Sequence, residues 1–282
     1  MSRWLFVSDL HGRKDRYQKL FAAARDEGPE AVLLGGDLLP HAGVSGPGGD
    51  FLLEWLLPRL EELRSQLLAD YPRLLALFGN DDPRAALVSL AEIEARGLAE
   101  HVHGRRIEIA GRSVYGYACV PPTPFRLKDW ERYDVSRFVD PGGISPEEGV
   151  RTVPAEELDT KWGTIASDLV RLAGDDDLTR ATCLFHAPPY RTALDRAALD
   201  GRSVDHALLD VNVGSIAIRR FIEARQPLLT LHGHVHESAR LTGSWREQIG
   251  RTLCLSAAHD GAELALVAFD PDDPEQATRR LV

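Results

Sequence analysis

Short apolar runs along the chain repeatedly end in small clusters of Asp, Asn, Gly or His. Runs bounded in this way are typical of buried strands. The five runs are 4–7 before Ser8-Asp9-Leu10-His11, 31–34 before Gly35-Gly36-Asp37, 74–78 before Gly79-Asn80-Asp81-Asp82, 183–185 before His186, and 228–231 before His232-Gly233-His234-Val235-His236. The pattern therefore predicts strands whose carboxyl ends carry polar side chains.

Segments with a helical spacing of apolar residues lie between several of these runs. We expect helices over 15–27, 51–68, 83–96 and 214–225. Pro58 predicts a kink or a start within the second helix, because proline has no backbone N–H to donate. For the third helix, Asp82 is suited to cap the start and Pro83 to occupy the first helical position. Strands that alternate with helices predict an α/β domain with a mainly parallel sheet.

The remaining strand-like segments follow one another without helices between them. Residues 107–109, 113–117, 251–255 and 263–269 predict hairpins in a second sheet, mixed or antiparallel. The fold class that follows is α/β, with two sheets packed face to face and helices outside, an αββα sandwich. We expect residues 1–282 to form a single domain.

A long segment from about 121 to 161 is rich in Pro, Gly and charged residues, with Trp130, Tyr133 and Phe138 scattered through it. A loop of this length inside a compact domain is usually functional or mobile. Two interpretations stand side by side at this point. The segment is either a solvated insertion or a lid on the substrate side.

The composition is that of an ordinary globular protein, with 44% hydrophobic and 27% charged residues. A chain of 282 residues can bury a core without a structural metal. The formal charge of −10 argues against a protein that coats nucleic acid. Three widely spaced cysteines without a Cys-x-x-Cys pair predict no disulfide framework. No apolar run approaches the ~18 residues of a membrane span, so we expect a cytoplasmic protein without a membrane partner.

The polar residues that follow the runs are carboxylate, imidazole and amide groups, which together suit Mn, Fe, Zn, Co or Mg. Ligands bind outside the carboxyl ends of strands in open α/β sheets, so these side chains are expected to converge. An Asp-x-His pair is expected about once by chance, whereas Gly-His-x-His is expected about 0.03 times, given 24 Gly and 10 His. Each residue alone could be a cap, a turn or a core residue, but the ordered series favours a metal centre.

The ordered series resembles the five-block pattern of calcineurin-like metallophosphoesterases. The blocks are Asp9-x-His11, Gly36-Asp37, Gly79-Asn80, His186 and Gly233-His234-x-His236, and they extend over nearly the whole chain. A narrower resemblance points to the Icc-related predicted phosphoesterases. It rests on His186-Ala187-Pro188-Pro189-Tyr190, on Val213-Gly214-Ser215 to Phe221-Ile222, and on Gln226-Pro227-Leu228-Leu229.

The resemblance implies two divalent metal ions and a role for each block. One ion would be held by Asp9, His11, Asp37 and His236. The other would be held by Asp37, Asn80, His186 and His234, with Asp37 bridging. A hydroxide between the ions would attack a phosphodiester or phosphomonoester, because a metal pair about 3.5–4 Å apart clamps both the attacking and the leaving oxygen. The catalytic residues implied are Asp37, Asn80 and Asp81, and the substrate is a small phosphate ester such as a nucleotide.

The third block departs from the resembled pattern, which commonly has Gly-Asn-His-Asp or Gly-Asn-His-Glu. Asp81 occupies the position of that histidine, which is thought to protonate the leaving oxygen or to bind phosphate. An aspartate with its ordinary pKa of about 3.9 is a weak proton donor at neutral pH. Either burial raises the pKa of Asp81, or His41 or His259 takes the role, or the leaving group needs little protonation. We favour the last, which indicates phosphodiesters or aryl-like leaving groups.

Two other functions stay open from the sequence. A nuclease could use the same metal centre, although the acidic net charge argues against it. A metal-binding scaffold or sensor with little turnover is suggested by the departure at Asp81. Among the other polar residues, we expect His41 in a loop, His101 and His103 on a strand, and Arg191 at the surface. The pattern makes no prediction of the oligomeric state.

Overall fold

The computed structural model describes residues 2–41 and 49–282 and places their longer strands in two sheets. The first sheet contains β1 (Trp4–Val7), β2 (Ala31–Gly35), β3 (Arg73–Leu77), β4 (Glu100–His101), β13 (Ala265–Asp270) and β14 (Asp273–Leu281). Their order across the sheet is β14-β13-β1-β2-β3-β4. The strands β1 to β4 run parallel, as the alternation of strands and helices predicted.

The second sheet is mixed. It contains β5 (Arg106–Ile109), β6 (Arg112–Tyr117), β7 (Thr182–Phe185), β10 (Leu229–His232), β11 (Arg246–Ile249) and β12 (Thr252–Ser256), in the order β11-β12-β10-β7-β6-β5. The inner strands run parallel, while β5 and β11 lie antiparallel at the two edges. A separate short hairpin is formed by β8 (Ser203–Val204) and β9 (Ala207–Leu208).

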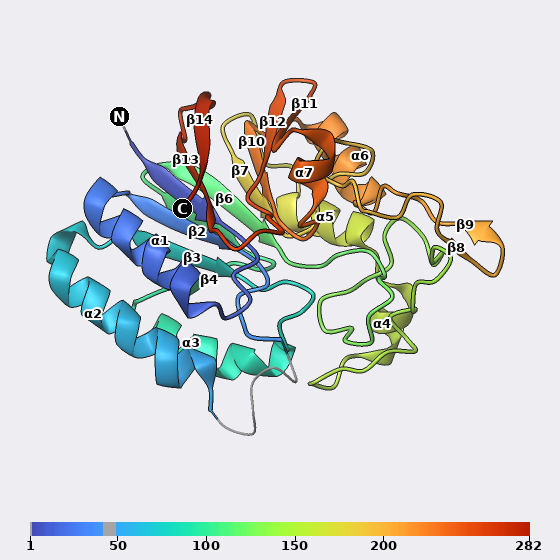
Figure 1. Cartoon of the computed structure of the whole chain (residues 1–282), viewed down its shortest axis with the longest axis horizontal. Coiled ribbons are helices and arrows are strands. Elements are labelled where there is room, and N and C mark those ends of the chain that lie inside the picture. Colours follow the sequence, from blue (N-terminus) through green and yellow to red (C-terminus); the bar gives the residue numbers. More distant parts are fainter. Residues whose placement is uncertain (1, 42–48) are drawn as a thin grey trace.

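Longer helices flank the two sheets, and shorter ones lie in the connecting segments. They are α1 (Lys14–Glu27), α2 (Leu57–Leu67), α3 (Leu87–Ala95), α4 (Glu157–Trp162), α5 (Ile165–Ala173), α6 (Ile216–Arg225) and α7 (Ser238–Thr242). Figure 1 shows α1, α2 and α3 beside the first sheet and α5 and α6 beside the second, so the predicted αββα arrangement is confirmed. Within the described residues, no helix combines the length and the apolar character that a membrane span requires.

The apolar core extends through both sheets. All four residues of β1 are fully buried, because a parallel strand in the middle of a sandwich is covered on both faces. This explains why the sequence of β1 is an unbroken apolar run rather than an alternation of apolar and polar residues. One buried cluster includes Leu33 of the first sheet and Leu231 of the second. On this ground we propose that the chain forms a single domain.

The sequence-based placement of segment 263–269 was wrong. The strand β13 does not join the second sheet but lies antiparallel to β1 in the first, with Trp4 opposite Phe269. The pattern of apolar residues identifies a strand but contains no information on its partner. The partner is set by the chain path, which brings β13 back beside the N-terminal strand.

The predicted helix over 83–96 begins later than expected. A 3-10 turn, Arg84–Ala86, precedes α3. Asp82 does not cap a helix, because its buried carboxylate accepts hydrogen bonds from the backbone amides of Leu38, Leu39 and Gly79. These donors belong to two different loops, so a tertiary contact replaces the local cap that the sequence predicted.

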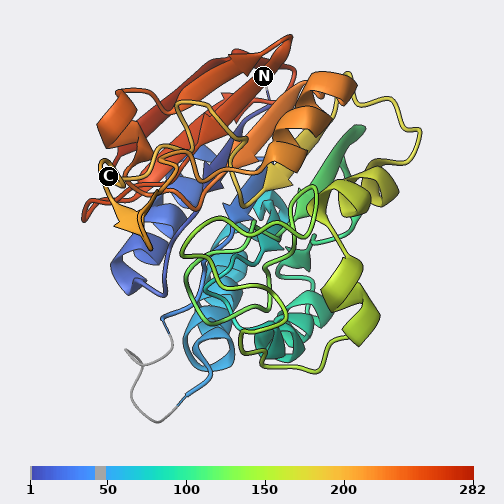
Figure 2. The same ribbon diagram turned by 90° about the vertical axis from the view of Figure 1, so that its right-hand side faces the viewer.

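The segment 121–161 has little regular structure before α4, yet its middle is buried. Figure 2 shows its loops, coloured green to yellow-green, on the face turned towards the viewer. Trp130 and Tyr133 are almost fully buried, and Lys128 forms an ion pair with Glu131 inside the protein. Phe138 is exposed. The middle of the segment is therefore part of the packed structure and not a solvated loop.

His103 lies against Trp130 and Tyr117, which are part of this packed region. Its Nδ1 accepts a hydrogen bond of 2.9 Å from the backbone amide of Ala118. Burial, followed by the positive charge of Arg84, lowers the pKa of His103 from 6.5 to about 3. Folding therefore requires a neutral ring. Stability from this group is fully present above about pH 6.5, and it is lost as the pH falls towards the lower pKa.

We expect the free energy of unfolding to drop by on the order of 1–2 kcal/mol between pH 7 and pH 5 because of His103 alone. His103→Asn keeps an acceptor for the Ala118 amide but cannot take up a proton, so this part of the pH dependence should vanish. Urea unfolding of both proteins at several pH values measures the difference. Parallel curves of stability against pH would contradict the assignment.

Candidate metal centre

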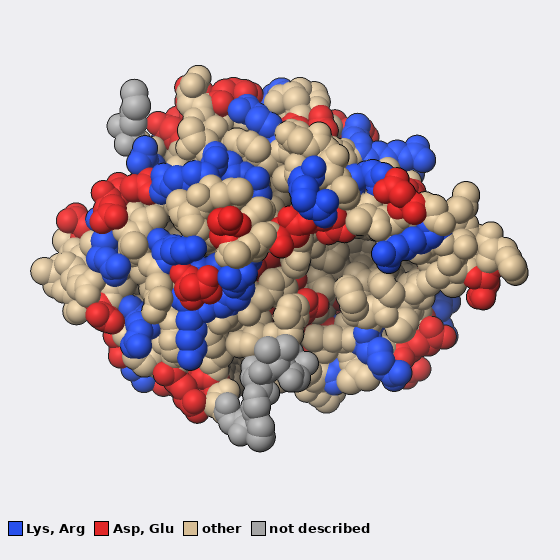
Figure 3. Space-filling model, viewed as in Figure 1, with Lys and Arg blue, Asp and Glu red and all other residues tan. Residues whose placement is uncertain are grey.

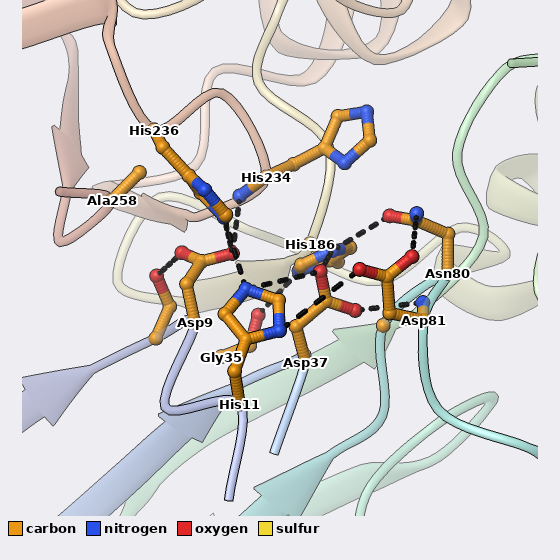
Figure 4. A network of polar contacts seen from close by, with 12 residues as sticks. Asp9, His11, Gly35, Asp37, Asn80, Asp81, His186, His234, His236 and Ala258 are labelled. Atoms are coloured by element: carbon orange, nitrogen blue, oxygen red, sulfur yellow. Dashed lines mark hydrogen bonds and ion pairs between the residues drawn. The ribbon is translucent and has the colours of Figure 1, made fainter. Parts of the chain in front are cut away.

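Polar side chains that follow five different strands meet at one edge of the sandwich (Figure 4). The strands are β1, β2, β3, β7 and β10. The side chains are Asp9, His11, Asp37, Asn80, His186, His234 and His236. The carboxyl ends of parallel strands lie at the same edge of a sheet, which explains why residues so far apart in sequence converge. The structure thus brings together all seven residues that the sequence predicted as metal ligands.

A first group of four side chains can offer one ligand atom each, with all four atoms within 4.8 Å of one another. Its members are Asp9, His11, Asp37 and His236. The Nε2 atoms of His11 and His236 are 3.1 Å apart, and His236 Nε2 lies 3.3 Å from Asp9 Oδ1. Two imidazole nitrogens and two carboxylate oxygens around one point suit a divalent transition metal.

A second group contains Asp37, His186 and His234, again with their ligand atoms within 4.8 Å. His186 Nε2 lies 3.4 Å from Asp37 Oδ2 and 3.1 Å from the amide oxygen of Asn80. Asn80 therefore adds a fourth oxygen or nitrogen donor to this group. Asp37 belongs to both groups, so its carboxylate lies between the two candidate metal positions.

Left-handed backbone conformations direct several of these side chains inward. Positive φ angles occur at Asp9 (56°), His11 (46°), Asp37 (53°) and His234 (74°). Each costs a residue other than glycine on the order of 1 kcal/mol or more, and such strain is concentrated at functional sites. The turns are held by backbone hydrogen bonds, in which the amide of Asp9 donates to Gly36 and that of His11 to Asp37.

Glycine precedes a candidate ligand in three of the blocks, and each glycine leaves space for a ligand from another block. The three are Gly36, Gly79 and Gly233. A methyl group at Gly79 would overlap Asp37 Oδ1 and His186 Nε2. One at Gly36 would overlap the ring of His186, and one at Gly233 would press on Asp9. The recurrent Gly-ligand pairs in the sequence are therefore a packing requirement of the centre.

Arg16 on α1 holds the turn that carries Asp9, and this residue was not predicted. The side chain is buried, and its guanidinium donates to the backbone carbonyl of Asp9 at 2.6 Å and to that of Gly261 at 2.7 Å. These bonds tie the turn that carries Asp9 to the loop after β12. Arg16 occupies an ordinary position in an amphipathic helix, so no sequence signal distinguishes it.

The buried carboxylates make positive charge favourable at the centre. Burial alone would raise the pKa of Asp9 and Asp37, but the imidazoles around them lower both values below the ordinary one. Burial alone would lower the pKa of His186 and His236, but the two carboxylates raise these values to about 10 and about 9. Protons on these two rings supply the positive charge that metal ions would supply when bound.

The other two imidazoles are held neutral. Burial lowers the pKa of His11 to about 4 and that of His234 to about 3. A histidine must be neutral to bind a metal ion, so this state is the one that a ligand requires. Together with the donor geometry, the charge balance shows that these residues fit divalent cations.

Asp81 and His41 extend the first group. Asp81 Oδ2 lies 3.2 Å from His41 Nδ1 and 3.9 Å from His11 Nδ1, and the rings of His41 and His11 stack at 4.3 Å. Burial, followed by the charge of Asp37, raises the pKa of Asp81 to about 6. His41 lies in a loop, as expected, and this loop places its ring beside Asp81 and His11. Its position just after the Gly-Asp block was the available signal. His259 instead contacts Glu263 at 3.1 Å.

Comparison with known proteins agrees with this geometry. A sequence model of the family described as calcineurin-like phosphoesterase matches residues 2–238. The chain belongs to the calcineurin-like phosphoesterase family. It is thus a hydrolase that acts on phosphoric esters, in a family that depends on divalent metal ions. No curated protein matches the chain in sequence.

Solved structures share the fold of this phosphoesterase. The protein TT1561 of Thermus thermophilus is 17% identical, with a TM-score of 0.58, and the alignment covers 99% of this chain and 98% of that one. Another solved structure aligns over 99% of this chain and 98% of its own, with a TM-score of 0.62 at 15% identity. At such identities the likeness concerns the fold alone.

We expect Gly79→Ala to weaken Mn²⁺ binding by at least about 10-fold, because the new methyl group displaces Asp37 or His186 from its place. Isothermal titration calorimetry measures the affinity. Gly104→Ala is the matched control, since a methyl group there meets no atom within 4 Å and its cost is limited to the backbone. Unchanged Mn²⁺ affinity in Gly79→Ala would show that the glycine is not needed for the centre.

Proposed function

We propose that this phosphoesterase hydrolyses a small phosphodiester at a centre of two divalent cations. The observation that carries the proposal is the position of Asp37 in both groups of candidate ligands. One cation would be held by Asp9, His11, Asp37 and His236. The other would be held by Asp37, Asn80, His186 and His234. The donor set is compatible with Mn, Fe, Zn, Co and Mg.

Different residues of the chain have different roles at such a centre. When bound, two divalent cations lower the pKa of a water molecule and neutralise charge on the phosphoryl oxygens. Asp37 belongs to both groups, so its negative charge would offset part of the repulsion between the two cations. Asn80 presents its amide oxygen beside His186 Nε2, and His186 Nδ1 lies 2.8 Å from the carbonyl of Gly35, which fixes the ring.

A small ester is favoured over a nucleic acid by the distribution of charge. The net charge is −10, and nucleic-acid binding depends on neutralising many phosphates with Lys and Arg. Figure 3 shows acidic and basic side chains interspersed on the face around the central hollow. A substrate with one phosphate group needs only the local positive charge of the centre.

His41 is the side chain that we assign to the leaving oxygen. Its imidazole is half exposed, and Nδ1 lies 3.2 Å from Asp81 Oδ2. The carboxylate orients the ring so that Nε2 is the nitrogen free to meet a substrate. Histidine is the commonest general acid in enzymes, so this pair can serve where the resembled pattern has a histidine at position 81. A donor here extends the range of leaving groups beyond those that need little protonation.

Asp37→Ala is expected to reduce Mn²⁺-dependent hydrolysis of an aryl phosphodiester by about 10³-fold or more, because both candidate metal positions lose a ligand. Release of the aryl alcohol measures the rate, and circular dichroism verifies the fold. Asp70→Ala, at an exposed position just after α2, is the control. A wild-type protein inactive with every divalent metal on a broad panel of esters would refute the proposal and leave a metal-binding scaffold.

His41→Gln is expected to slow hydrolysis of an alkyl phosphodiester by about 10²-fold or more and to change that of an aryl ester little. The physical reason is that an alkoxide needs a proton to leave, whereas an aryl oxide is already a stable leaving group. The ratio of the two rates in each protein is the measurement. Equal losses on both esters would remove His41 from the role of proton donor.

A further inference from the structure

Residue 81 contacts three candidate ligands. Its backbone amide donates to Asp37 Oδ1 at 2.9 Å, its Oδ1 accepts from the side-chain amide of Asn80 at 3.0 Å, and its Oδ2 lies 3.9 Å from His11 Nδ1. We propose that Asp81 is a positioning residue whose carboxylate orients one ligand of each cation site, Asn80 and His11. The proposal rests on the ligand set of the proposed function.

The first half of the argument concerns the orientation of Asn80. A side-chain amide has one oxygen and one NH₂ group, and an ionised carboxylate only accepts hydrogen bonds. Oδ1 of Asp81 therefore holds the NH₂ group on its own side. The amide oxygen is then turned to the opposite side, where it lies 3.1 Å from His186 Nε2. An oxygen is the atom that a divalent cation needs from this residue.

The second half concerns the ring of His11. Its Nε2 faces the first group, 3.1 Å from His236 Nε2, so Nδ1 points away from the group. Nδ1 is buried and has no hydrogen-bond partner among the described residues. Asp81 Oδ2 lies 3.9 Å from it. A metal-binding histidine nearly always donates its second N–H to a carboxylate, a carbonyl or water, which fixes both the tautomer and the ring orientation.

These contacts favour a positioning role for Asp81 over the role of a proton donor. Oδ1 of Asp81 is engaged by Asn80, and Oδ2 is shared between the two stacked imidazoles of His11 and His41. Both oxygens thus face side chains of the protein. The same carboxylate holds His41, so a single residue connects both cation sites and the imidazole that we assign to the leaving oxygen.

The test uses Asp81→Asn in the full chain. The new amide offers only one acceptor, so it can satisfy Asn80 or His11 but not both, and its NH₂ group would face another donor. We expect Mn²⁺ affinity, measured by calorimetry, to fall by about 10- to 100-fold. The visible absorption of bound Co²⁺, which reports ligand geometry, should change as well. Asp81→Glu, which keeps a carboxylate, should recover part of the affinity.

The control is Asp200→Asn, at an exposed position that pairs with Arg196. It should bind Mn²⁺ as the wild type does. Thermal unfolding without metal shows whether Asp81→Asn is folded. If it is not, the Mn²⁺ affinity of Asp81→Glu is the measurement that decides. Wild-type affinity and an unchanged Co²⁺ spectrum in Asp81→Asn would overturn this inference alone. A wild-type protein that binds no divalent cation would overturn it together with the proposed function.

Discussion

Asp9 and Asp37 carry two carboxylates that the fold removes from water and holds within 4.8 Å of each other. Two buried negative charges at such a distance repel strongly and lack hydration, so the folded state requires positive charge beside them. Without metal, protons on His186 and His236 supply it, since the carboxylates raise the pKa of both rings. The same field favours divalent cations, and these histidines would be able to bind them once they lose their protons.

The rest of the centre follows from the need to bring donors around these two carboxylates without steric overlap. Parallel strands deliver the side chains to one edge, and left-handed turns direct them inward at a cost in backbone energy. Glycines such as Gly79 leave the space that a neighbouring ligand fills. Asp82 joins the loops after β2 and β3 through three backbone amides. These features place backbone strain at the centre. Burial of the large apolar core elsewhere in the protein can offset the cost in free energy.

The sequence predicted which side chains converge, because the candidate ligands follow strands and apolar runs with glycine mark where strands end. It could not predict contacts that depend on the path of the chain. The pairing of β13 with β1 is one, and the three amides bound by Asp82 are another, because a local cap and a tertiary acceptor have the same sequence pattern. His41 is a loop histidine in the sequence pattern, and only the tertiary structure shows that its ring stacks on that of His11.

A carboxylate at position 81 also affects which substrate the centre prefers. In the proposed centre of two divalent cations, the carboxylates of Asp9, Asp37 and Asp81 would leave about one positive charge, whereas a neutral histidine at 81 would leave about two. A phosphomonoester carries about two negative charges at neutral pH and a phosphodiester carries one. At about 5 Å and an effective dielectric of about 20, each unit charge changes the interaction by ~3 kcal/mol. A carboxylate at position 81 would therefore weaken binding of a dianion more than that of a monoanion, which is a physical reason for proposing a phosphodiester as the substrate.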